Sequence, residues 1–440
     1  MKAVLKKYIP IFIFRFYRFL KAYSAAMLYG WPSKDLVIIG VTGTKGKSMT
    51  ANFIWAGLTG AGLKTGLIST ANLRIGEKEF LNNYHMTMPD SFQIHKMLAK
   101  MKQENCKVVI IETTSEGIAQ FRHKGIAYDL LVFTNLTPEH IQSHGTFENY
   151  RIAKQTIFKE LYYQRRKTIN GLDIPKAIIV NIDSEESKNF LQFQADKKIT
   201  FTTQFNIANN GRVDFIAQDI REYGRGVSFQ IDKKEVILHI PGYFNVSNCL
   251  PVFAICSLLN LNREMVIVGL ENLKIIPGRM EIVQNKPFSV IVDYAHEKES
   301  LTALLKSIKQ IKKDGNIILL MGAEGGGRDK AKRALMGEIG AKKADYLIVS
   351  NVDPYDEDPK EIISDIAESA KENGKTLDKD LFLIENREDG IKKAISLAQD
   401  GDFVLITGKG SEQSMIIGKR HLPWDDRDIV KKLLKLNKSG

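Results

Sequence analysis

The chain has 440 residues, of which 44% are hydrophobic and 26% are charged. This balance describes a globular protein that is long enough for two or three domains. The three cysteines (Cys106, Cys249 and Cys256) are too few and too scattered for a disulfide framework or a zinc ribbon, so we expect a reducing cytoplasm. The formal net charge of +12 suits anionic partners, but we find no nucleic-acid recognition module.

Residues 1–35 form a basic, aromatic N-terminal segment. Seven basic residues and no acidic residue occur in residues 1–34. Arg15 and Arg18 interrupt the apolar run, which is therefore too short to span a bilayer, and no signal-peptide cleavage site follows it. Two readings remain open. Residues 1–30 form a helix on the anionic inner face of a membrane, or the helix packs on the domain behind it.

Residues 36–56, LVIIGVTGTKGKSMTANFIWA, combine a short apolar run, a glycine-rich turn and an apolar-periodic segment. A strand, a turn and a helix in this order predict a phosphate-binding loop, in which backbone N–H groups and the helix N-terminus hold phosphate. Lys47 can reach the terminal phosphates of ATP, and the Ser48 hydroxyl can ligate Mg²⁺. Five residues rather than four separate Gly40 from Gly46, and the alternative is an ordinary strand-to-helix turn. The expected ATP-binding residues are Gly43, Thr44, Lys45, Gly46, Lys47 and Ser48.

The pattern predicts an α/β fold with two domains after the N-terminal segment. Strands and helices alternate over 36–277, which is typical of a P-loop-type ATPase domain with a parallel sheet. Within it, residues 198–240 read as a small antiparallel patch of short strands. A turn signal at Ile276-Pro277-Gly278 marks the boundary, and the alternation restarts over 278–440 as a smaller Rossmann-like α/β domain.

Polar residues follow the predicted strands, at the edge where open α/β sheets bind ligands. Glu112 ends the strand VVII, and Glu139-His140 lies beyond the strand LLVF. Glu112 and His140 are candidate Mg²⁺ ligands, although histidine is the less usual one. Taken alone, each is more often a surface or packing residue than a ligand.

Longer motifs, which occur in order from about residue 36 to 430, carry a resemblance. They are TGTKGKS at 42–48, FTNLTPEHIQSHGTFENYRIAK at 133–154, GYFNVSN at 242–248, PGRME at 277–281, VDYAH at 292–296, GGRDKAKR at 326–333 and GKGSE at 408–412. The set resembles the Mur ligase family of ATP-dependent amide ligases. Within the family, it is most similar to the branch that adds the third residue of the peptidoglycan stem peptide.

The resemblance implies a role for each matching residue. Ser48, Glu112 and His140 would ligate Mg²⁺, and Lys154 would carry a carbamate that bridges to a second Mg²⁺, because carbamylation turns its ammonium into an anion. Lys47, Lys154, His140 and Glu112 would then be the catalytic set. ATP would also contact Asn245, Asn248, Arg279, Asp293 and His296. Ser115 would contact the acceptor, and the amino acid would lie near Arg328, Asp353, Tyr355, Gly408 and Glu412.

The implied reaction is the activation of a carboxylate by ATP to an acyl phosphate, followed by attack of an amino group. Closure of the second domain over the first would exclude water from the intermediate. The substrates would be ATP, an amino acid and a nucleotide- or lipid-linked muramyl peptide. A non-catalytic ATP-binding module for a cell-wall partner is the alternative from another functional class.

The sequence departs from the family in three places. Val352-Asp353-Pro354-Tyr355 stands where diaminopimelate-adding members have D-N-P-R, so an uncharged Tyr355 makes diaminopimelate doubtful and favours lysine. The family's N-terminal uridine-binding domain has no counterpart in residues 1–34, which leaves a poly-γ-glutamate, folate or lipid-linked acceptor as alternatives. Thr114-Ser115-Glu116, Glu139 and Ser411 replace other family residues.

Overall fold

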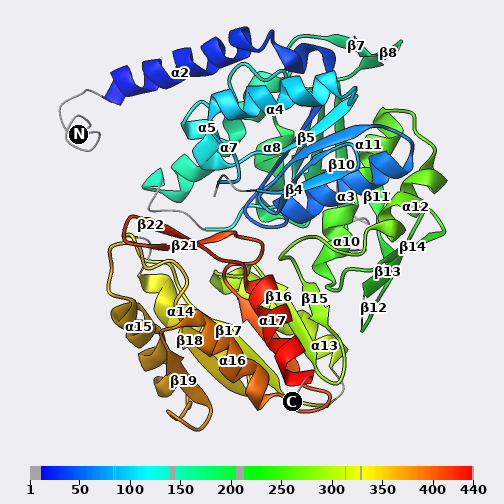
Figure 1. Cartoon of the computed structure of the whole chain (residues 1–440). Helices are drawn as coiled ribbons and strands as arrows, with labels where there is room; N and C mark the ends of the chain where they lie inside the picture. Colours follow the sequence, from blue (N-terminus) through cyan, green and yellow to red (C-terminus); the bar gives the residue numbers. More distant parts are fainter. Residues whose placement is uncertain are drawn as a thin grey trace.

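The structure is a computed structural model, and it describes residues 11–82, 84, 86–138, 144–169, 171–204, 213–224, 226–312, 314–327 and 330–438. His140 and Arg328, two of the predicted site residues, lie outside the described residues. Two α/β units follow a long N-terminal helix, and each is built around its own large sheet (Figure 1).

The first sheet has β1 near its centre, between β5 and β6. These strands are parallel, with Ile39 opposite both Ile110 and Leu130. They are buried along their whole length, as a sheet covered on both faces requires. Residues that follow β1, β5 and β6 therefore meet at one edge. In spatial order the described strands are β11 (Phe215–Ile216), β10 (Lys197–Thr202), β9 (Ala177–Asn181), β6 (Leu130–Phe133), β1 (Val37–Thr42), β5 (Val108–Glu112), β2 (Thr65–Ile68), β3 (Asn72–Ile75) and β4 (Lys78–Leu81).

The antiparallel patch predicted over 198–240 is only partly correct. β12 (Gln218–Tyr223), β13 (Gly226–Ile231) and β14 (Lys234–Leu238) do form a separate antiparallel sheet. β10 and β11 instead extend the large sheet, with Ile199 opposite Ile179 in a parallel pair. A short helical crossover over residues 185–191 makes this parallel return possible, and its brevity hides it in the sequence pattern.

Two helices of the first unit begin at residues whose side chains cap the free backbone N–H groups of the first turn. Asp90 and Gln93 form a capping box at the start of α4, and Thr146 caps α7. The helical segment of residues 244–258 divides where Pro251 lacks an N–H. The helical elements are η1 (Pro32–Asp35), α3 (Lys47–Gly60), α4 (Ser91–Gln103), α5 (Ser115–Ala119), α7 (Phe147–Leu161), η2 (Glu185–Ser187), α8 (Lys188–Leu191), α10 (Phe244–Cys249), α11 (Pro251–Leu258) and α12 (Arg263–Asn272); β7 (Lys167–Ile169) and β8 (Leu172–Ile174) form a hairpin.

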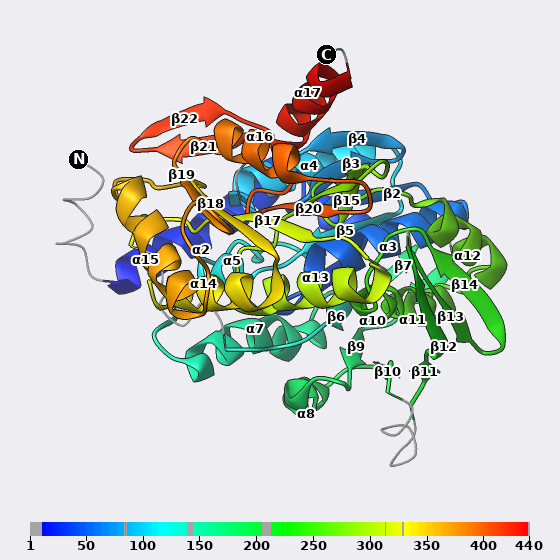
Figure 2. The ribbon, with the colours of Figure 1, turned by 90° about the horizontal axis from the view of Figure 1, so that it is seen from below.

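The second unit is a sheet with helices on both faces (Figure 2). Its strands are, in spatial order, β15 (Glu281–Gln284), β16 (Ser289–Asp293), β20 (Phe403–Thr407), β17 (Ile317–Met321), β18 (Tyr346–Ser350) and β19 (Leu381–Ile384). One face is covered by α13 (Lys298–Ile311), α14 (Ala331–Lys343) and α15 (Pro359–Glu372), and the other by α16 (Arg387–Leu397) and α17 (Asp426–Lys438). A hairpin of β21 (Ser414–Ile417) and β22 (Arg420–Pro423) projects from it.

The N-terminal helix α2 (Ile11–Leu28) packs on the first unit through one face only. Ala22, Ala25 and Ala26 are fully buried, and the Phe19 ring meets the Phe121 ring edge-on at 6.2 Å. Lys21 is paired with Asp90 at 2.5 Å. The opposite face leaves large apolar side chains exposed. Within the described part of the chain, no helix is both long and apolar enough to cross a bilayer.

A buried charge cluster lies at the edge of the first sheet where β1 and β6 begin. Both carboxylate oxygens of Asp129 are paired, one with Lys167 at 2.6 Å and the other with Lys176 at 2.8 Å, and all three side chains are buried. Asp129 also accepts the N–H of Ile38, which ties the start of β1 to the start of β6. Burial lowers the pKa of Lys167 to about 8, although Asp129 opposes the shift.

We predict that Asp129→Asn destabilises the protein strongly, because two buried ammonium groups lose their carboxylate. The expected loss is about 3–5 kcal/mol in the free energy of unfolding, measured by urea denaturation. Asp400→Asn, at an exposed position, serves as the control and should change it by less than about 0.5 kcal/mol. Equal losses in the two variants would show that the cluster does not stabilise the fold.

Candidate active site

The loop between β1 and α3 is held by the end of β6. The N–H of Thr44 donates to the carbonyl of Asn135 at 2.8 Å, and the N–H of Lys45 donates to Asn135 Oδ1 at 2.9 Å. Thr134 Oγ1 donates to the Lys45 carbonyl at 2.7 Å. A Cβ on Gly43 would lie 2.0 Å from Thr134 Oγ1, so this close approach requires glycine.

Gly46 brings two predicted nucleotide contacts to the same loop. It starts α3 with a φ of 81°, and a Cβ there would lie 2.2 Å from Asn248 Oδ1. Asn248 donates to Asn245 Oδ1 at 3.1 Å, and Asn245 donates to the Pro241 carbonyl at 2.7 Å. Both asparagines are buried. The structure therefore brings Gly46 together with Asn245 and Asn248, which come about 200 residues later in the chain.

Ser48 and Glu112 form a pair of oxygen donors beside the loop. Ser48 Oγ donates to Glu112 Oε2 at 2.8 Å, and the N–H of Thr70 donates to the same oxygen at 2.8 Å. The described residues contain no group of three or more His, Cys, Asp or Glu side chains that could hold a metal. A hydroxyl and one carboxylate still fit Mg²⁺, which usually binds one or two protein oxygens together with phosphate and water. Lys47 Nζ donates to the Thr44 carbonyl at 2.8 Å.

Lys154 lies in the interior of the site, although the sequence alone would place it on the surface. Its side chain is 1% exposed, and Nζ donates to the carbonyl of Gly43 at 2.7 Å. Tyr150, one turn earlier on α7, places its ring 4.8 Å from that Nζ and its hydroxyl 3.1 Å from Thr44 Oγ1. Sequence reasoning missed Tyr150, because a tyrosine on a helix gives no signal of its own.

Ser115 meets a histidine that the sequence did not single out. His144 Nε2 lies 3.1 Å from Ser115 Oγ, and its ring lies 5.3 Å from that of Tyr150. Burial lowers the pKa of His144, the nearby Lys154 lowers it further, and Glu116 opposes both. A neutral imidazole is thus expected beside the predicted acceptor residue at neutral pH. The spacing of two histidines in HIQSH was the available signal.

The second unit reaches the phosphate loop through Arg279. Its Nη2 lies 3.5 Å from Ser48 Oγ, and its guanidinium lies 4.2 Å from the centre of the Tyr294 ring. Asp293 accepts the N–H groups of Met280 and Ala295 at 2.7 and 2.8 Å, which fixes the turn that carries Arg279. Burial raises the pKa of Asp293, and these hydrogen bonds and Arg279 oppose the shift.

Two other predicted residues of this unit lie close by. His296 Nδ1 lies 2.7 Å from the carbonyl of Tyr294, so this nitrogen is oriented toward the backbone. The N–H of Gly408 donates to the Asp293 carbonyl at 3.2 Å. A second contact between the units is made by Ser411 Oγ, which donates to the carbonyl of Ala71 at 3.2 Å.

Lys409, which sequence reasoning also missed, joins two predicted amino-acid contacts. Its Nζ lies 2.8 Å from Asp353 and 2.7 Å from Glu412, and it is fully buried. The other oxygen of Asp353 accepts the N–H of Ile416 at 2.7 Å. Asp353 is therefore compensated within the protein, whereas Glu412 is partly exposed and also accepts the Tyr294 hydroxyl at 3.3 Å. Contact of either carboxylate with an amino acid stays a prediction.

Tyr355 is fixed by backbone contacts to the projecting hairpin. It has a φ of 53°, donates its N–H to the Ile416 carbonyl and accepts the N–H of Gly418 at 2.7 Å. Its ring approaches Gly326, in the loop that precedes Arg328. Tyr355 therefore lies beside the segment predicted to bind the amino acid.

Comparison with known proteins decides the family. Residues 41–256 match the Mur ligase middle domain, and residues 278–410 match the Mur ligase glutamate ligase domain. The chain belongs to the Mur ligase family. It is therefore an ATP-dependent, Mg²⁺-using ligase that forms amide bonds, and the predicted resemblance and α/β fold class are confirmed.

Several curated Mur ligases are similar over most of their length. The UDP-N-acetylmuramoyl-L-alanyl-D-glutamate–2,6-diaminopimelate ligase 1 of Clostridium acetobutylicum is 33% identical over 421 residues, which cover 94% of this chain and 81% of that protein. The UDP-N-acetylmuramyl-tripeptide synthetase of Treponema denticola is 34% identical over 425 residues, which cover 93% and 78%.

Solved structures show the same architecture. A UDP-N-acetylmuramoyl-L-alanyl-D-glutamate–2,6-diaminopimelate ligase is 25% identical with a TM-score of 0.61, covering 92% of this chain and 79% of that one. The folylpolyglutamate synthase of Mycobacterium tuberculosis has a TM-score of 0.70 at 16% identity, covering 89% and 92%, which shows the fold alone.

We predict that Glu112→Gln lowers kcat by at least about 100-fold, because a neutral amide oxygen binds Mg²⁺ far more weakly than a carboxylate does. Steady-state phosphate release at several Mg²⁺ concentrations measures the change in kcat, and circular dichroism checks that the variant is folded. Glu104→Gln, at an exposed carboxylate on the same unit, is the matched control. If Glu112→Gln kept wild-type activity at low Mg²⁺, the assignment would be wrong.

Proposed function

We propose that this Mur ligase joins an amino acid to a muramyl-peptide-type acceptor in peptidoglycan precursor synthesis. An acceptor carboxylate oxygen attacks the γ-phosphorus of ATP, and ADP leaves. The amine of the amino acid then attacks the acyl carbon, phosphate leaves, and the amine loses a proton. The names of the similar ligases support this reaction, since they describe amino-acid addition to muramyl peptides.

One observation carries the proposal: Ser48 Oγ contacts Glu112 of its own unit and Arg279 of the other. A phosphate held by the loop would thus have a Mg²⁺ ligand on one side and a guanidinium on the other, which neutralises charge in phosphoryl transfer. Because this contact needs the two units close together, the same arrangement would help to keep water from an acyl phosphate. We place the reaction in the cytoplasm, where ATP is available.

We further propose that Lys154 reacts with CO₂ to form a carbamate and that two Mg²⁺ ions serve the site. Its Nζ lies beside the phosphate loop, where an ammonium would repel a second cation and a carbamate would attract one. Glu112 and Ser48 support one ion. His140, which is outside the described residues, is proposed for the other with the carbamate.

The proposed amino acid is lysine. Asp353 and Glu412 bring two negative charges against the single positive charge of Lys409, so one net negative charge faces the site. That charge suits a distal ammonium, and Tyr355 offers no cation for the distal carboxylate of diaminopimelate. Arg328, outside the described residues, is proposed for the α-carboxylate.

We also propose peripheral contact of α2 with a membrane, which favours a lipid-linked form of the acceptor. The exposed apolar face of α2 supports this, and its packed end contacts the Phe121 segment that follows α5. Ser115, the predicted acceptor residue, starts α5. Helix α2 and helix α5, whose first residue is the predicted acceptor contact, therefore lie on the same side of the first unit (Figure 1).

We predict that repeated turnover of ATP to ADP requires both an acceptor and an amino acid, because an acyl phosphate formed without the amine does not go on to product. Phosphate release over a panel of UDP- and lipid-linked muramyl peptides, folate and poly-γ-glutamate identifies the acceptor. Lys154→Ala should lower the rate of phosphate release at least about 100-fold, and short carboxylates should restore part of it. Lys96→Ala, at an exposed position of α4, should leave the rate unchanged. ATP binding without ADP formation on any acceptor of the panel would favour a non-catalytic module instead.

We predict that kcat/KM is at least about 10-fold higher for lysine than for meso-diaminopimelate, a difference of about 1.4 kcal/mol. Tyr355→Arg should narrow or reverse this ratio by supplying a cation, while Tyr223→Arg, at an exposed position on the first unit, should leave it unchanged. A wild-type preference for diaminopimelate would refute the lysine proposal.

A further inference from the structure

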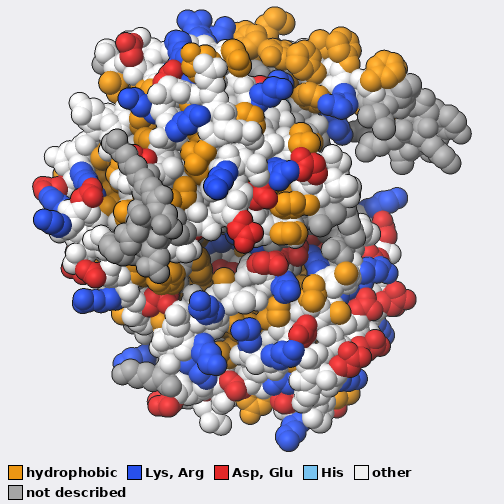
Figure 3. All heavy atoms as spheres, turned by 180° about the vertical axis from the view of Figure 1, so that it is seen from behind, with side chains coloured by type: hydrophobic (Ala, Val, Ile, Leu, Met, Phe, Trp, Pro, Cys, Tyr) orange, Lys and Arg blue, Asp and Glu red, His pale blue; other side chains and the backbone are white. Residues whose placement is uncertain are grey.

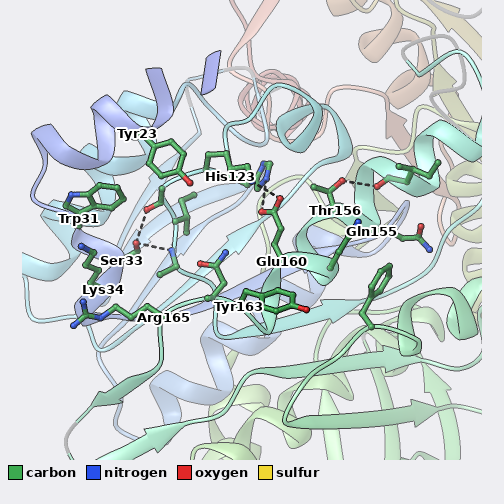
Figure 4. A pocket seen from close by; sticks show the side chains of 18 of the residues that line it. Tyr23, Trp31, Ser33, Lys34, His123, Gln155, Thr156, Glu160, Tyr163 and Arg165 are labelled. Carbon is green, nitrogen blue, oxygen red and sulfur yellow. Dashed lines mark hydrogen bonds and ion pairs between the residues drawn. The ribbon is translucent and has the colours of Figure 1, made fainter. Parts of the chain in front are cut away.

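A pocket of about 1020 Å³ lies far from the phosphate loop. It is bounded by the segments just before β1 and β6, by the C-terminal half of α7 and by the end of α2 (Figure 4). Because β1 and β6 are parallel and the phosphate loop follows β1, residues that precede these strands lie at the opposite edge of the sheet. The pocket is therefore separate from the ATP site.

The pocket wall combines aromatic rings with cations. Glu160 is the carboxylate among its described lining residues, and it is paired with Lys124 at 2.6 Å. The remaining cations leave the wall with a positive charge, so it suits an anion that also has an apolar part. The rings are Tyr23, Trp31, Tyr163 and Phe193, and the cations are Lys34, Lys124, Lys159 and Arg165.

A buried histidine lines the same pocket and faces its carboxylate, Glu160. His123 is 3% exposed, and among the described residues neither ring nitrogen makes a hydrogen bond of good geometry. Its Nε2 lies 3.5 Å from Glu160, toward which it points (Figure 4). Burial lowers the pKa of His123. His123 therefore acts on this wall through Glu160, and the positive charge of the pocket comes from its lysines and its arginine.

The pocket is continuous with the exposed face of α2. Tyr23 belongs to both, and its ring lies 5.9 Å from that of Trp31. Phe12, Phe16 and Met27 on that face are 69, 61 and 68% exposed. Residues 12–34 contain no acidic side chain, and apolar side chains gather with basic ones at this end of the molecule (Figure 3). Apolar and basic residues in this arrangement are typical of a helix in the bilayer interface.

We propose that α2 and this pocket together bind an anionic phospholipid. The acyl chains would lie along the exposed face of α2, and the phosphate would lie between Lys34, Lys159 and Arg165. This inference rests on the proposed membrane contact and adds a headgroup site to it. A soluble phosphate ester could use the same cations, but it would leave the apolar face of α2 without a function.

Vesicle flotation of the full-length protein tests the proposal, without nucleotide, so that the result is independent of ligase activity. Vesicles of phosphatidylcholine alone are compared with vesicles containing phosphatidylglycerol. A pocket variant carries Lys34→Met, Lys159→Met and Arg165→Met. A helix variant carries Phe12→Ser and Phe16→Ser. A charge control carries Lys371→Met, Lys379→Met and Lys392→Met, at exposed positions of the second unit.

The wild type and the charge control should bind the anionic vesicles at least about 10-fold more tightly than the neutral ones. The pocket variant should lose that preference and keep weak binding to both, and the helix variant should lose binding to both. An unchanged preference in the pocket variant, or an equal loss in the charge control, would overturn the headgroup site. Glycerol 3-phosphate binding as tightly as the vesicles would identify a soluble ligand instead. Absence of wild-type binding, with dimers that the helix variant lacks, would identify a second copy of the chain as the occupant.

Discussion

The close approach of the loop at residues 43–46 to the end of β6 is the constraint on which the site depends. Gly43 and Gly46 have no room for a side chain, because the side chains of Thr134 and Asn248 fill the space where a Cβ would lie. Only glycine allows the backbone to approach these side chains so closely. The carbonyl of Gly43 then accepts a hydrogen bond from Lys154 Nζ. One steric requirement therefore places the lysine, the asparagines and the serine at the start of α3 around a common centre.

Buried charges in this protein are compensated locally. Glu112 is held by a hydroxyl and a backbone N–H, and Asp293 by two N–H groups. Lys409 lies between two carboxylates, and Asp129 between two lysines. In each case at least one partner comes from a different segment, so the charge also fixes how the segments meet. The chemistry of the site and the register of the fold thus depend on the same pairs.

The features predictable from the sequence were those with local signals. The glycine spacing and the Lys-Ser pair located the loop, and apolar runs located β5, β6 and the strands of the second unit. Contacts between distant segments gave no such signal. Lys154 and Gly43 are 111 residues apart, and nothing in the helix around Lys154 indicates a buried lysine. The same holds for the Asp353–Lys409 pair, which changes the reading of Asp353 from a free charge to a compensated one.

The linker between the units, at Gly278, also contacts residues 410–411 of the loop that is predicted to bind the amino acid. A Cβ on Gly278 would lie 2.1 Å from the backbone nitrogen of Ser411, and Ser411 in turn contacts Ala71 of the first unit. Lys409 and Glu412 flank this serine within three residues. The linker and the loop predicted to bind the amino acid thus share one backbone contact, so a rotation of the second unit about Gly278 would move that loop against the first unit.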